Sequence, residues 1–567
     1  MSAARQPVRG TSSGFYRASH GIETFHEPKG EGDVMRRASL TLFITFACAF
    51  PVAAERISAV RQSMRSDVVV YGATAGGVMA AVAAADEGAS VVLLEPGRHV
   101  GGMVSGGLGW TDMDRQEHLI GGYAREFFER VGRHYRQPNA WRFEPKVAEK
   151  ILRDWLTETK VRVLLEHRLH SVRKDGPRIT SLRTENGAEF TASVYIDSSY
   201  EGDLMKAAGV SYTIGRESGS RYGESLAGRR ENLPGNHQFK APVSPYDDEG
   251  RLAPYVVRQE DLAPLAAGDG RIQAYCFRLC LTDVQTNQAP IQRPPNYDPK
   301  RFVLARNYLR SAGQILTFGD FAGIRSRLPN GKVDANSSGA VSLNLPGAST
   351  EYPEASYARR KEIWDEHLTW AQGLLYYVQN DPEVPTAIQE EARRWGLARD
   401  EFVDTGHWPH QLYIREARRM LGEYVLTQYD LQDSRHKYDS IGMGGYNVDI
   451  REVQWVAYTI FRFPKVVQEV LMEGYVSQPV EPYQIPYRSL LPRQHQADNL
   501  LVTSCISASS VAYASFRMEP QYMIAGHAAG VAAALGARSK TPVHKLDLAA
   551  LQRRLIEQRQ ILSWVSR

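Results

Sequence analysis

The feature that most constrains this chain is a strand, turn, helix and strand that follow one another after residue 66. Residues 68–71 are all apolar and predict a buried strand, and the glycine-rich turn GATAGG follows directly. The alanine-rich segment 78–87 has helical spacing, Gly88 predicts its end, and residues 91–94 predict a second buried strand. One helix joining two apolar strands is a βαβ unit, so we expect an α/β fold with a parallel sheet.

The turn of this unit has the chemistry of a dinucleotide-binding loop. Gly72 permits a tight turn, and the unpaired N–H groups at the start of the helix can bind a pyrophosphate. Glu95 closes the second strand 23 positions after Gly72 and can accept hydrogen bonds from ribose hydroxyls. Thr74 stands where the usual pattern has its second glycine. The predicted cofactor-binding residues here are Gly72, Thr74, Ala75, Gly76, Gly77 and Glu95.

A second glycine-rich stretch, GRHVGGMVSGGLGW at 97–110, favours FAD over a nicotinamide cofactor. In flavoproteins of the glutathione-reductase type such a stretch runs along the pyrophosphate toward the flavin. Residues 161–197 then predict a strand, a small β-meander and a strand that ends at Asp197. A meander before the last strand of the dinucleotide fold is the flavoprotein arrangement. We therefore predict FAD, with further contacts from Gly101, Gly102, Met103, Gly106, Gly107 and Asp197.

These segments resemble the large bacterial family of FAD-dependent oxidoreductases that carry a GGTxAG motif near the N-terminus. The similar stretches span about 66–540 and include YGATAGG at 71, GGMVSGGLG at 101, YIDSSYEGD at 195, LYIREARRML at 412, DSIGMGGYNVD at 439 and IPYRSLLPRQ at 485. Two positions depart from the family pattern, because Ser510 replaces an expected histidine and His527 a commoner glutamine. The resemblance implies a flavin-dependent redox enzyme and leaves the substrate open.

The placement of the similar stretches predicts the domain organisation. We expect residues 66–225 plus 480–540 to form a discontinuous FAD-binding domain of the glutathione-reductase kind, with 226–479 as an inserted mixed α+β substrate domain and 541–567 as a C-terminal helix. The segment RMEPQYMIAGHAAGVAAAL predicts a helix with small residues at one-turn spacing. Its start, with Arg517 and Glu519, is expected beside the flavin, where the helix dipole and the arginine would stabilise the negative charge of reduced flavin.

The predicted substrate site lies between the flavin and the inserted domain. Residues 412–428 predict a helix that places Arg415, Arg418 and Arg419 on one face, and Arg418 is the residue we expect to bind a substrate oxygen. The alternative is a solvated charged face, with Arg415 or Arg419 as the residue that points inward.

Two further residues are candidates for this site. His410, which precedes the predicted helix, could act as a general base, as could the neighbouring His407. Tyr446 belongs to a polar, glycine-rich loop at 439–449 that could bind a hydroxylated substrate. Structural histidines and an ordinary turn are the alternatives.

Residues 1–54 are predicted to lie outside the fold as an upstream extension and a signal peptide. Met35 is followed by two arginines, a mostly apolar stretch at 38–52 and the small residues Ala53 and Ala54. This layout is typical of a signal peptide at about 35–54, so we expect a periplasmic or secreted protein that begins near Glu55. A membrane-anchored or buried N-terminal helix is the alternative, and the mature chain shows no other run suited to a membrane.

Composition excludes several other classes. The 68 basic and 64 acidic residues nearly cancel, and no long basic block occurs, so nucleic acid is not an expected partner. Cys276, Cys280 and Cys505 remain after the signal segment and are expected to be buried thiols. DANSSG at 334–339 lacks the closing Glu of a calcium loop, so no metal is predicted.

The function predicted from the sequence is an exported FAD-dependent dehydrogenase or oxidase. It would move a hydride between flavin N5 and a small polar substrate, which could be hydroxylated or sugar-like. The alternatives are a double-bond reductase similar to fumarate reductase, a flavin-assisted lyase and a structural flavoprotein. The sequence leaves the electron acceptor open.

Overall fold

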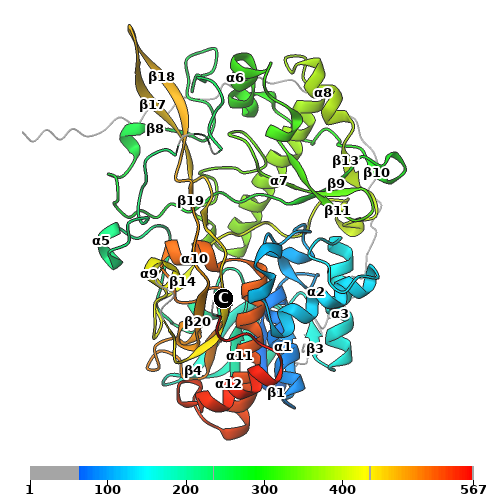
Figure 1. Cartoon of the computed structure of the whole chain (residues 1–567), viewed down its shortest axis with the longest axis vertical. Coiled ribbons are helices and arrows are strands. Elements are labelled where there is room, and N and C mark those ends of the chain that lie inside the picture. Colours follow the sequence, from blue (N-terminus) through cyan, green and yellow to red (C-terminus); the bar gives the residue numbers. More distant parts are fainter. Residues whose placement is uncertain (1–62, 234, 236, 433–435, 565–567) are drawn as a thin grey trace, which may run out of the picture. The chain divides into compact units, whose positions relative to one another are not determined.

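The βαβ unit predicted after residue 66 is present in the computed structural model, which describes residues 63–564 except 234, 236 and 433–435 (Figure 1). Strand β1 (Ser63–Tyr71) runs parallel to β2 (Val91–Leu94), and α1 (Ala75–Asp86) connects them. Thr74 caps α1, because its hydroxyl oxygen accepts a hydrogen bond from the Gly77 N–H at 3.1 Å. Gly72 has a φ of +94°, a conformation in which a side chain would be strained.

The sheet around β1 has seven strands in the order β3-β2-β1-β6-β5-β4, and β21 also pairs with β6. Strands β2 and β3 and strands β6 and β21 pair in parallel, whereas β5 pairs with β4 and with β6 in antiparallel fashion. The predicted meander and the strand that ends at Asp197 are therefore confirmed. The bounds of the remaining strands are β3 (Arg162–Leu164), β4 (Leu169–Asp175), β5 (Arg178–Thr184), β6 (Glu189–Asp197) and β21 (Leu500–Val502).

The predicted small-residue helix is α11 (Glu519–Ser539), and it packs against α1 (Figure 1). A Cβ atom on Gly526 would lie 2.0 Å from the Gly76 carbonyl oxygen, and one on Gly530 would lie 2.2 Å from that of Ala80. The small residues therefore allow the two helices to approach closely. Part of the predicted C-terminal helix is present as α12 (Leu548–Glu557).

The middle of the chain contains a second sheet of five strands in the order β10-β13-β9-β12-β11. Its strands are β9 (Leu279–Thr282), β10 (Gln288–Ala289), β11 (Gly323–Leu328), β12 (Lys332–Asn336) and β13 (Gly396–Ala398), and its longer helices are α6 (Val303–Ala312), α7 (Tyr357–Asn380) and α8 (Thr386–Arg393). The described residues between 63 and 564 form one compact unit, so the domain boundaries near 225 and 480 remain predictions.

The prediction of a helix at 412–428 is wrong. Residues 412–418 form no helix, and Arg419 and Met420 form the short strand β14, which pairs with β7 (Tyr212–Thr213). The spacing of the arginines is misleading because these side chains do not share a solvated face. Each of Arg415, Arg418 and Arg419 is at most 2% exposed and has its own set of partners.

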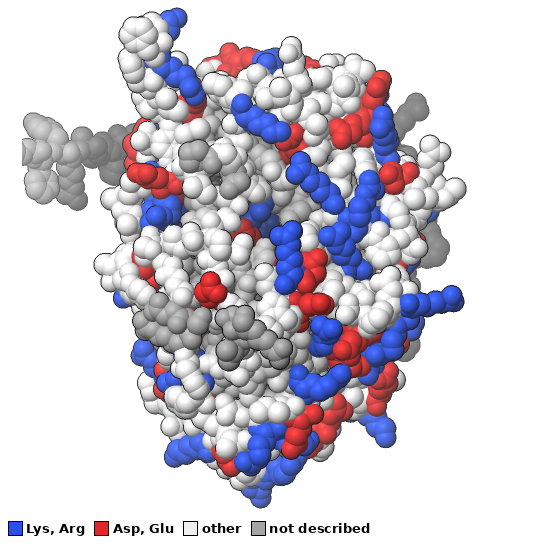
Figure 2. Space-filling view, in the orientation of Figure 1, with Lys and Arg blue, Asp and Glu red and all other residues white. Residues whose placement is uncertain are grey.

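Several smaller expectations have clear outcomes in the described part of the chain. Cys276, Cys280 and Cys505 are free and buried, as predicted. The predicted signal segment lies outside the described residues. Among those residues, no helix combines the length and the apolar character needed to cross a bilayer. On the face shown in Figure 2, basic and acidic side chains are intermixed and no broad basic patch forms.

Candidate functional site

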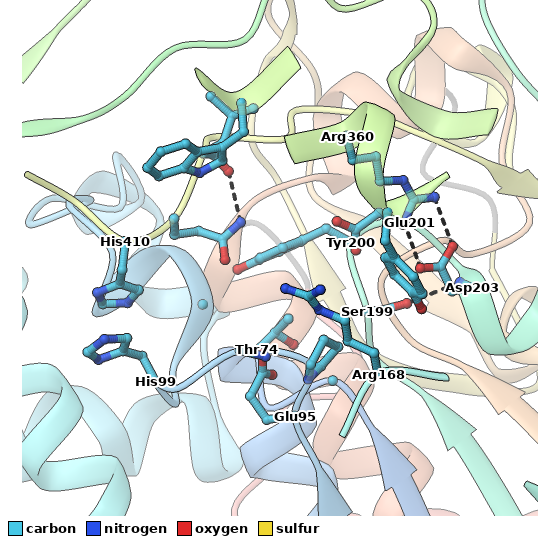
Figure 3. A pocket seen from close by; sticks show the side chains of 18 of the residues that line it. Thr74, Glu95, His99, Arg168, Ser199, Tyr200, Glu201, Asp203, Arg360 and His410 are labelled. Atoms are coloured by element: carbon cyan, nitrogen blue, oxygen red, sulfur yellow. Dashed lines mark hydrogen bonds and ion pairs between the residues drawn. The ribbon is translucent and has the colours of Figure 1, made fainter. Parts of the chain in front are cut away.

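A cavity of about 290 Å³ lies where β1, β2 and β6 end and α1 begins. We call it the dinucleotide cavity (Figure 3). Four predicted cofactor-binding residues line it, namely Gly72, Thr74, Glu95 and Gly102. In an α/β sheet, ligands bind at this carboxyl edge of the strands, and the first turn of α1 offers N–H groups to an anion. The cavity is thus placed for the pyrophosphate and ribose of a dinucleotide.

Glu95 is held in place by the backbone at the end of β2. Its Oε2 accepts a hydrogen bond from the Ala73 N–H and its Oε1 one from the Gly97 N–H, each at 2.7 Å. Burial raises the pKa of this carboxyl to about 7. A carboxylate oxygen can accept more than one hydrogen bond, so Glu95 can still bind a ribose hydroxyl inside the cavity.

His410 lines the same cavity and is stacked on His99, with ring centroids 3.7 Å apart (Figure 3). Both of its ring nitrogens are buried and lack a hydrogen-bond partner among the described residues. Burial lowers the pKa of His410 to about 3, so the ring is neutral. Unsatisfied polar atoms that face a cavity fit a bound polar ligand. The structure places His410 with the dinucleotide site, and not beside Tyr446 as predicted.

The second glycine-rich stretch connects the dinucleotide cavity to the start of α11. The Met103 N–H donates to the Tyr200 hydroxyl at 2.9 Å, and that hydroxyl donates to Glu519 Oε1 at 2.6 Å. Glu519 Oε2 is buried without a partner in the described part of the chain, and burial raises the pKa of Glu519 to about 8. Residues predicted separately as cofactor contacts are therefore joined in one hydrogen-bonded chain.

The remaining predicted cofactor residues have structural roles in this arrangement. Gly101 has a φ of +104°, and a Cβ atom on Gly107 would lie 2.0 Å from the Arg278 carbonyl oxygen. Asp197 is not among the residues that line the cavity. Its carboxylate oxygens instead accept hydrogen bonds from Ser199 and Met205 at 2.7–3.0 Å. Asp197 instead shapes the turn from which Ser199 reaches the cavity.

A second cavity, of about 270 Å³, lies at the start of α11. We call it the arginine cavity, because Arg278, Arg415, Arg451 and Arg517 line it together with Asp112 and Asp449. Tyr413, Tyr446 and Asn447 also face it, so the predicted polar loop and Arg517 do meet here. Sequence analysis named Arg517 and Tyr446 but did not identify Arg278 or Arg451 as part of the site.

Three of these arginines have acidic partners. Arg278 donates to both oxygens of Asp334 at 2.7 Å, and Arg517 donates to Asp449 Oδ2 at 2.9 Å. Arg451 lies 3.7 Å from a Glu452 carboxylate oxygen. Their charges are therefore balanced within the protein.

Arg415 is different, because no carboxylate lies within ion-pair distance of it among the residues the structure describes. Its guanidinium donates to the Ala274 carbonyl oxygen and to Asn344 Oδ1, and it lies 3.2 Å from Cys276 Sγ. Burial lowers its pKa. An uncompensated buried cation is costly, so this position favours an anionic group of a ligand.

Asp112 faces the arginine cavity and was missed by sequence analysis. Its φ is +59°, an uncommon value for a residue other than glycine. Its carboxylate accepts no hydrogen bond from the described residues, and burial raises its pKa to about 6 despite the nearby Arg278. A signal was present in the sequence, since this acidic residue lies two positions after the end of the second glycine-rich stretch.

Arg418 and Arg419 lie outside this cavity. Arg418 donates to Asp203 Oδ1 at 2.8 Å and to Glu354 Oε1 at 2.6 Å, and Arg419 donates to Glu217 at 2.7 Å. The contact between Arg418 and Asp203 fixes the chain beside the dinucleotide cavity, which Asp203 lines. Of the three arginines proposed from sequence, Arg415 is the one that reaches the arginine cavity.

One acidic group in the described chain has the spacing of a metal site, and it consists of Glu144, Asp400 and Glu401. The Lys332 ammonium lies 2.5–2.8 Å from an oxygen of each of them. Lys332 therefore already supplies the cation that these carboxylates need.

The parallel sheet, the capped glycine-rich turn and the dinucleotide cavity define a dinucleotide-binding α/β protein. The chain belongs to the family described as FAD dependent oxidoreductase, whose profile matches residues 67–555. It is accordingly an FAD-dependent oxidoreductase, and its cofactor is FAD. The donors around the dinucleotide cavity fit this group, as the unsatisfied nitrogens of His410 show.

Among curated proteins none matches the chain. Solved structures that resemble it include a flavoprotein/dehydrogenase from Cytophaga hutchinsonii, at 20% identity over 26% of this chain and 43% of that chain, with a TM-score of 0.20. Another is L-amino acid deaminase from Proteus vulgaris, at 15% identity over 28% and 52% of the two chains, with a TM-score of 0.20. A third is 3-ketosteroid-Δ4-(5α)-dehydrogenase from Rhodococcus jostii RHA1, at 14% identity over 27% and 50%, with a TM-score of 0.18. The match thus covers about half or less of each of these solved chains.

Proposed function

We propose that this protein is an exported flavoenzyme that oxidises a small polar substrate by hydride transfer to flavin N5. The arginine cavity at the start of α11 is the observation that carries the proposal. It adjoins the segment after the second glycine-rich stretch through Asp112 and the middle region through Arg278. In this proposal the FAD-binding part is of the glutathione-reductase kind, and residues 226–479 form the inserted substrate domain.

The dinucleotide cavity would hold the adenosine and pyrophosphate part of FAD, with Glu95 on the ribose and the first turn of α1 on the phosphates. FAD, when bound, supplies the acceptor for a hydride that leaves the substrate carbon. Arg517 precedes α11, and Asp449 balances its charge. The positive end of the helix dipole is therefore what favours negative charge at this position.

Within the arginine cavity, the chain's own residues divide the remaining work. Arg415 binds an anionic oxygen of the substrate, because its charge has no other partner among the described residues. Asp112, with a pKa of about 6, is ionised at neutral pH and accepts the hydroxyl proton as the carbonyl forms. Tyr446, whose pKa burial raises far above its usual range, stays protonated and can donate a hydrogen bond to that oxygen.

The double-bond reductase remains a second candidate, and one observation favours it. Burial lowers the pKa of Arg415, which makes this guanidinium a better acid than an exposed one. In that reaction Arg415 would give a proton to one carbon of an activated double bond while the other carbon receives the hydride. A dehydrogenase reduces its flavin with a hydroxy acid, whereas a reductase reoxidises dithionite-reduced flavin with an unsaturated acid.

Export is part of the proposal and rests on the sequence between Met35 and Ala54. Expression of the full chain in a bacterial host, followed by fractionation, tests it. N-terminal sequencing should find a periplasmic protein that begins near Glu55. Cytosolic protein that retains residues 1–34 would refute export without affecting the flavin chemistry.

The function is tested by an anaerobic screen of the FAD-bound protein. Hydroxylated acids, sugars and unsaturated acids are added, and the flavin absorbance is followed. We expect at least one hydroxylated compound to bleach the flavin, with Arg415→Met abolishing the effect and retaining bound FAD. Arg359→Met is the matched control, since Arg359 is an exposed arginine with two acidic partners. Equal bleaching by Arg415→Met protein would contradict the proposed site.

A further inference from the structure

A third cavity, of about 520 Å³, shares two lining residues with the arginine cavity. We call it the outer cavity. The shared residues are Tyr475 and Ser477, which belong to or precede strand β19 (Val476–Gln478). Because Tyr475 and Ser477 line both cavities, the two cavities are neighbours across this segment of the chain. The outer cavity is therefore the chamber next to the proposed substrate site.

The residues between the two cavities are connected to the arginine cavity itself. β19 pairs with β16 (Val448–Ile450), which places Ser477 opposite Asp449, the partner of Arg517. Tyr475 lies two residues before Ser477, and Gly474 before it has a φ of +95°. Gly474 thus holds a backbone conformation that glycine adopts most easily, directly before a residue that lines both cavities.

The outer cavity differs chemically from the arginine cavity. Leu226, Leu233 and Leu265 line it, and Leu233 and Leu265 are 39% and 49% exposed. Arg229 and Arg230 also line it, with Glu231 as an acidic neighbour. Exposed leucines that gather at a cavity mark a place where an apolar group can be removed from water.

We propose that the two cavities bind one substrate, with a carboxylate head at Arg415 and a longer apolar tail in the outer cavity. This rests on the proposed function for the anionic head and the hydroxyl group that is oxidised. It replaces a small polar substrate by a hydroxylated carboxylic acid with an extended hydrocarbon part. The arginine cavity supplies the unbalanced positive charge, and the leucines of the outer cavity supply apolar contacts for the tail. A sugar-like substrate, which was one expectation from the sequence, has no apolar part that would contact the leucines of the outer cavity.

The test uses sodium acetate, hexanoate and decanoate as probes and isothermal titration of the FAD-bound protein as the measurement. Affinity should rise with chain length, by at most about fourfold for each methylene that is buried. The same affinity for all three acids would overturn the two-part site. Because binding needs no turnover, this result is independent of whether any compound reduces the flavin.

Three variants assign the binding to the two chambers. Leu265→Asp should flatten the dependence on chain length and leave acetate binding unchanged, while Arg415→Met should weaken all three acids at least tenfold. Ile315→Asp is the control, because Ile315 is 58% exposed and lines neither chamber. An unaltered chain-length dependence in Leu265→Asp protein would overturn the outer chamber. Retained acetate binding in Arg415→Met protein would overturn the head-group assignment.

Discussion

The Tyr200 hydroxyl donates a hydrogen bond of 2.6 Å to Glu519 Oε1, and both side chains are buried. The same hydroxyl accepts the Met103 N–H, so the second glycine-rich stretch is tied to the first residue of α11. These segments are more than 400 residues apart in the chain. The contact therefore closes the FAD-binding part around the returning helix, next to the arginine cavity.

The raised pKa of Glu519 predicts that the stability of the folded protein depends on pH. Its pKa is raised to about 8 in the folded protein, whereas an exposed glutamate titrates near 4.3. Between about pH 5 and 8 the folded state keeps this proton, whereas the unfolded state has lost it. The contribution of Glu519 to the free energy of unfolding is therefore largest below about pH 4 and is lost as pH rises toward 8. Glu519→Gln should remove up to about 1.4 kcal/mol of this loss per pH unit.

Thermal unfolding at saturating FAD, followed by circular dichroism at pH 5, 6, 7 and 8, measures the effect. The Tm of Glu519→Gln protein should vary less with pH than that of the wild type. Glu185→Gln, on the exposed turn of the meander, is the control. Parallel curves for the wild type and Glu519→Gln would show that Glu519 does not hold the proton.

Glu95 should be required for FAD binding. Glu95→Ala removes the acceptor of the Ala73 and Gly97 N–H groups and the predicted ribose contact together. We expect the FAD dissociation constant to rise at least tenfold, with the fold retained by circular dichroism. Titration of apoprotein with FAD, followed by flavin fluorescence, measures it, and Glu185→Ala serves as the exposed control. Unchanged affinity would mean that the dinucleotide lies elsewhere.

Asp112 predicts the pH profile of the reaction. A base with a pKa of about 6 is ionised above that value, so flavin reduction should fall as pH drops below 6 and should level off above 7. Asp112→Asn should lower the rate by on the order of 100-fold or more and abolish this inflection. Stopped-flow reduction of the flavin from pH 5 to 8 checks both points. A slow variant that keeps the inflection would assign the base to another residue.

Substitution of Arg418 should lower the stability of the fold and should not act directly on the reaction. Its guanidinium is buried against Asp203, and losing one partner of such a pair costs about 3–5 kcal/mol. Arg359→Met, an exposed pair, should cost less than about 1 kcal/mol. Chemical denaturation compares the two variants. If Arg418→Met unfolds no more easily than Arg359→Met, the ion pair at Asp203 is not structural.

The sequence predicted the dinucleotide part well because its signals are local. The turn at Gly72, the strand end at Glu95 and the small residues around Gly526 each report a geometry that neighbouring residues enforce. The proposed substrate site depends on tertiary contacts, and these could not be predicted from the spacing of residues in the sequence. Arg415 and Arg418 are three positions apart as on a helix, yet the chain there is not helical. Arg415 lines the arginine cavity, whereas Arg418 is buried against Asp203 and Glu354.

We propose that the substrate meets the flavin in the arginine cavity. A crystal structure of the FAD-bound protein tests this location through the distances from the flavin ring to the cavity residues. We expect the ring to border the cavity, with Arg517 and Asp112 on its open side and Arg415 within reach of a substrate between them. A structure in which all three side chains lie more than about 10 Å from the ring, far beyond hydrogen-bond distance, would contradict it.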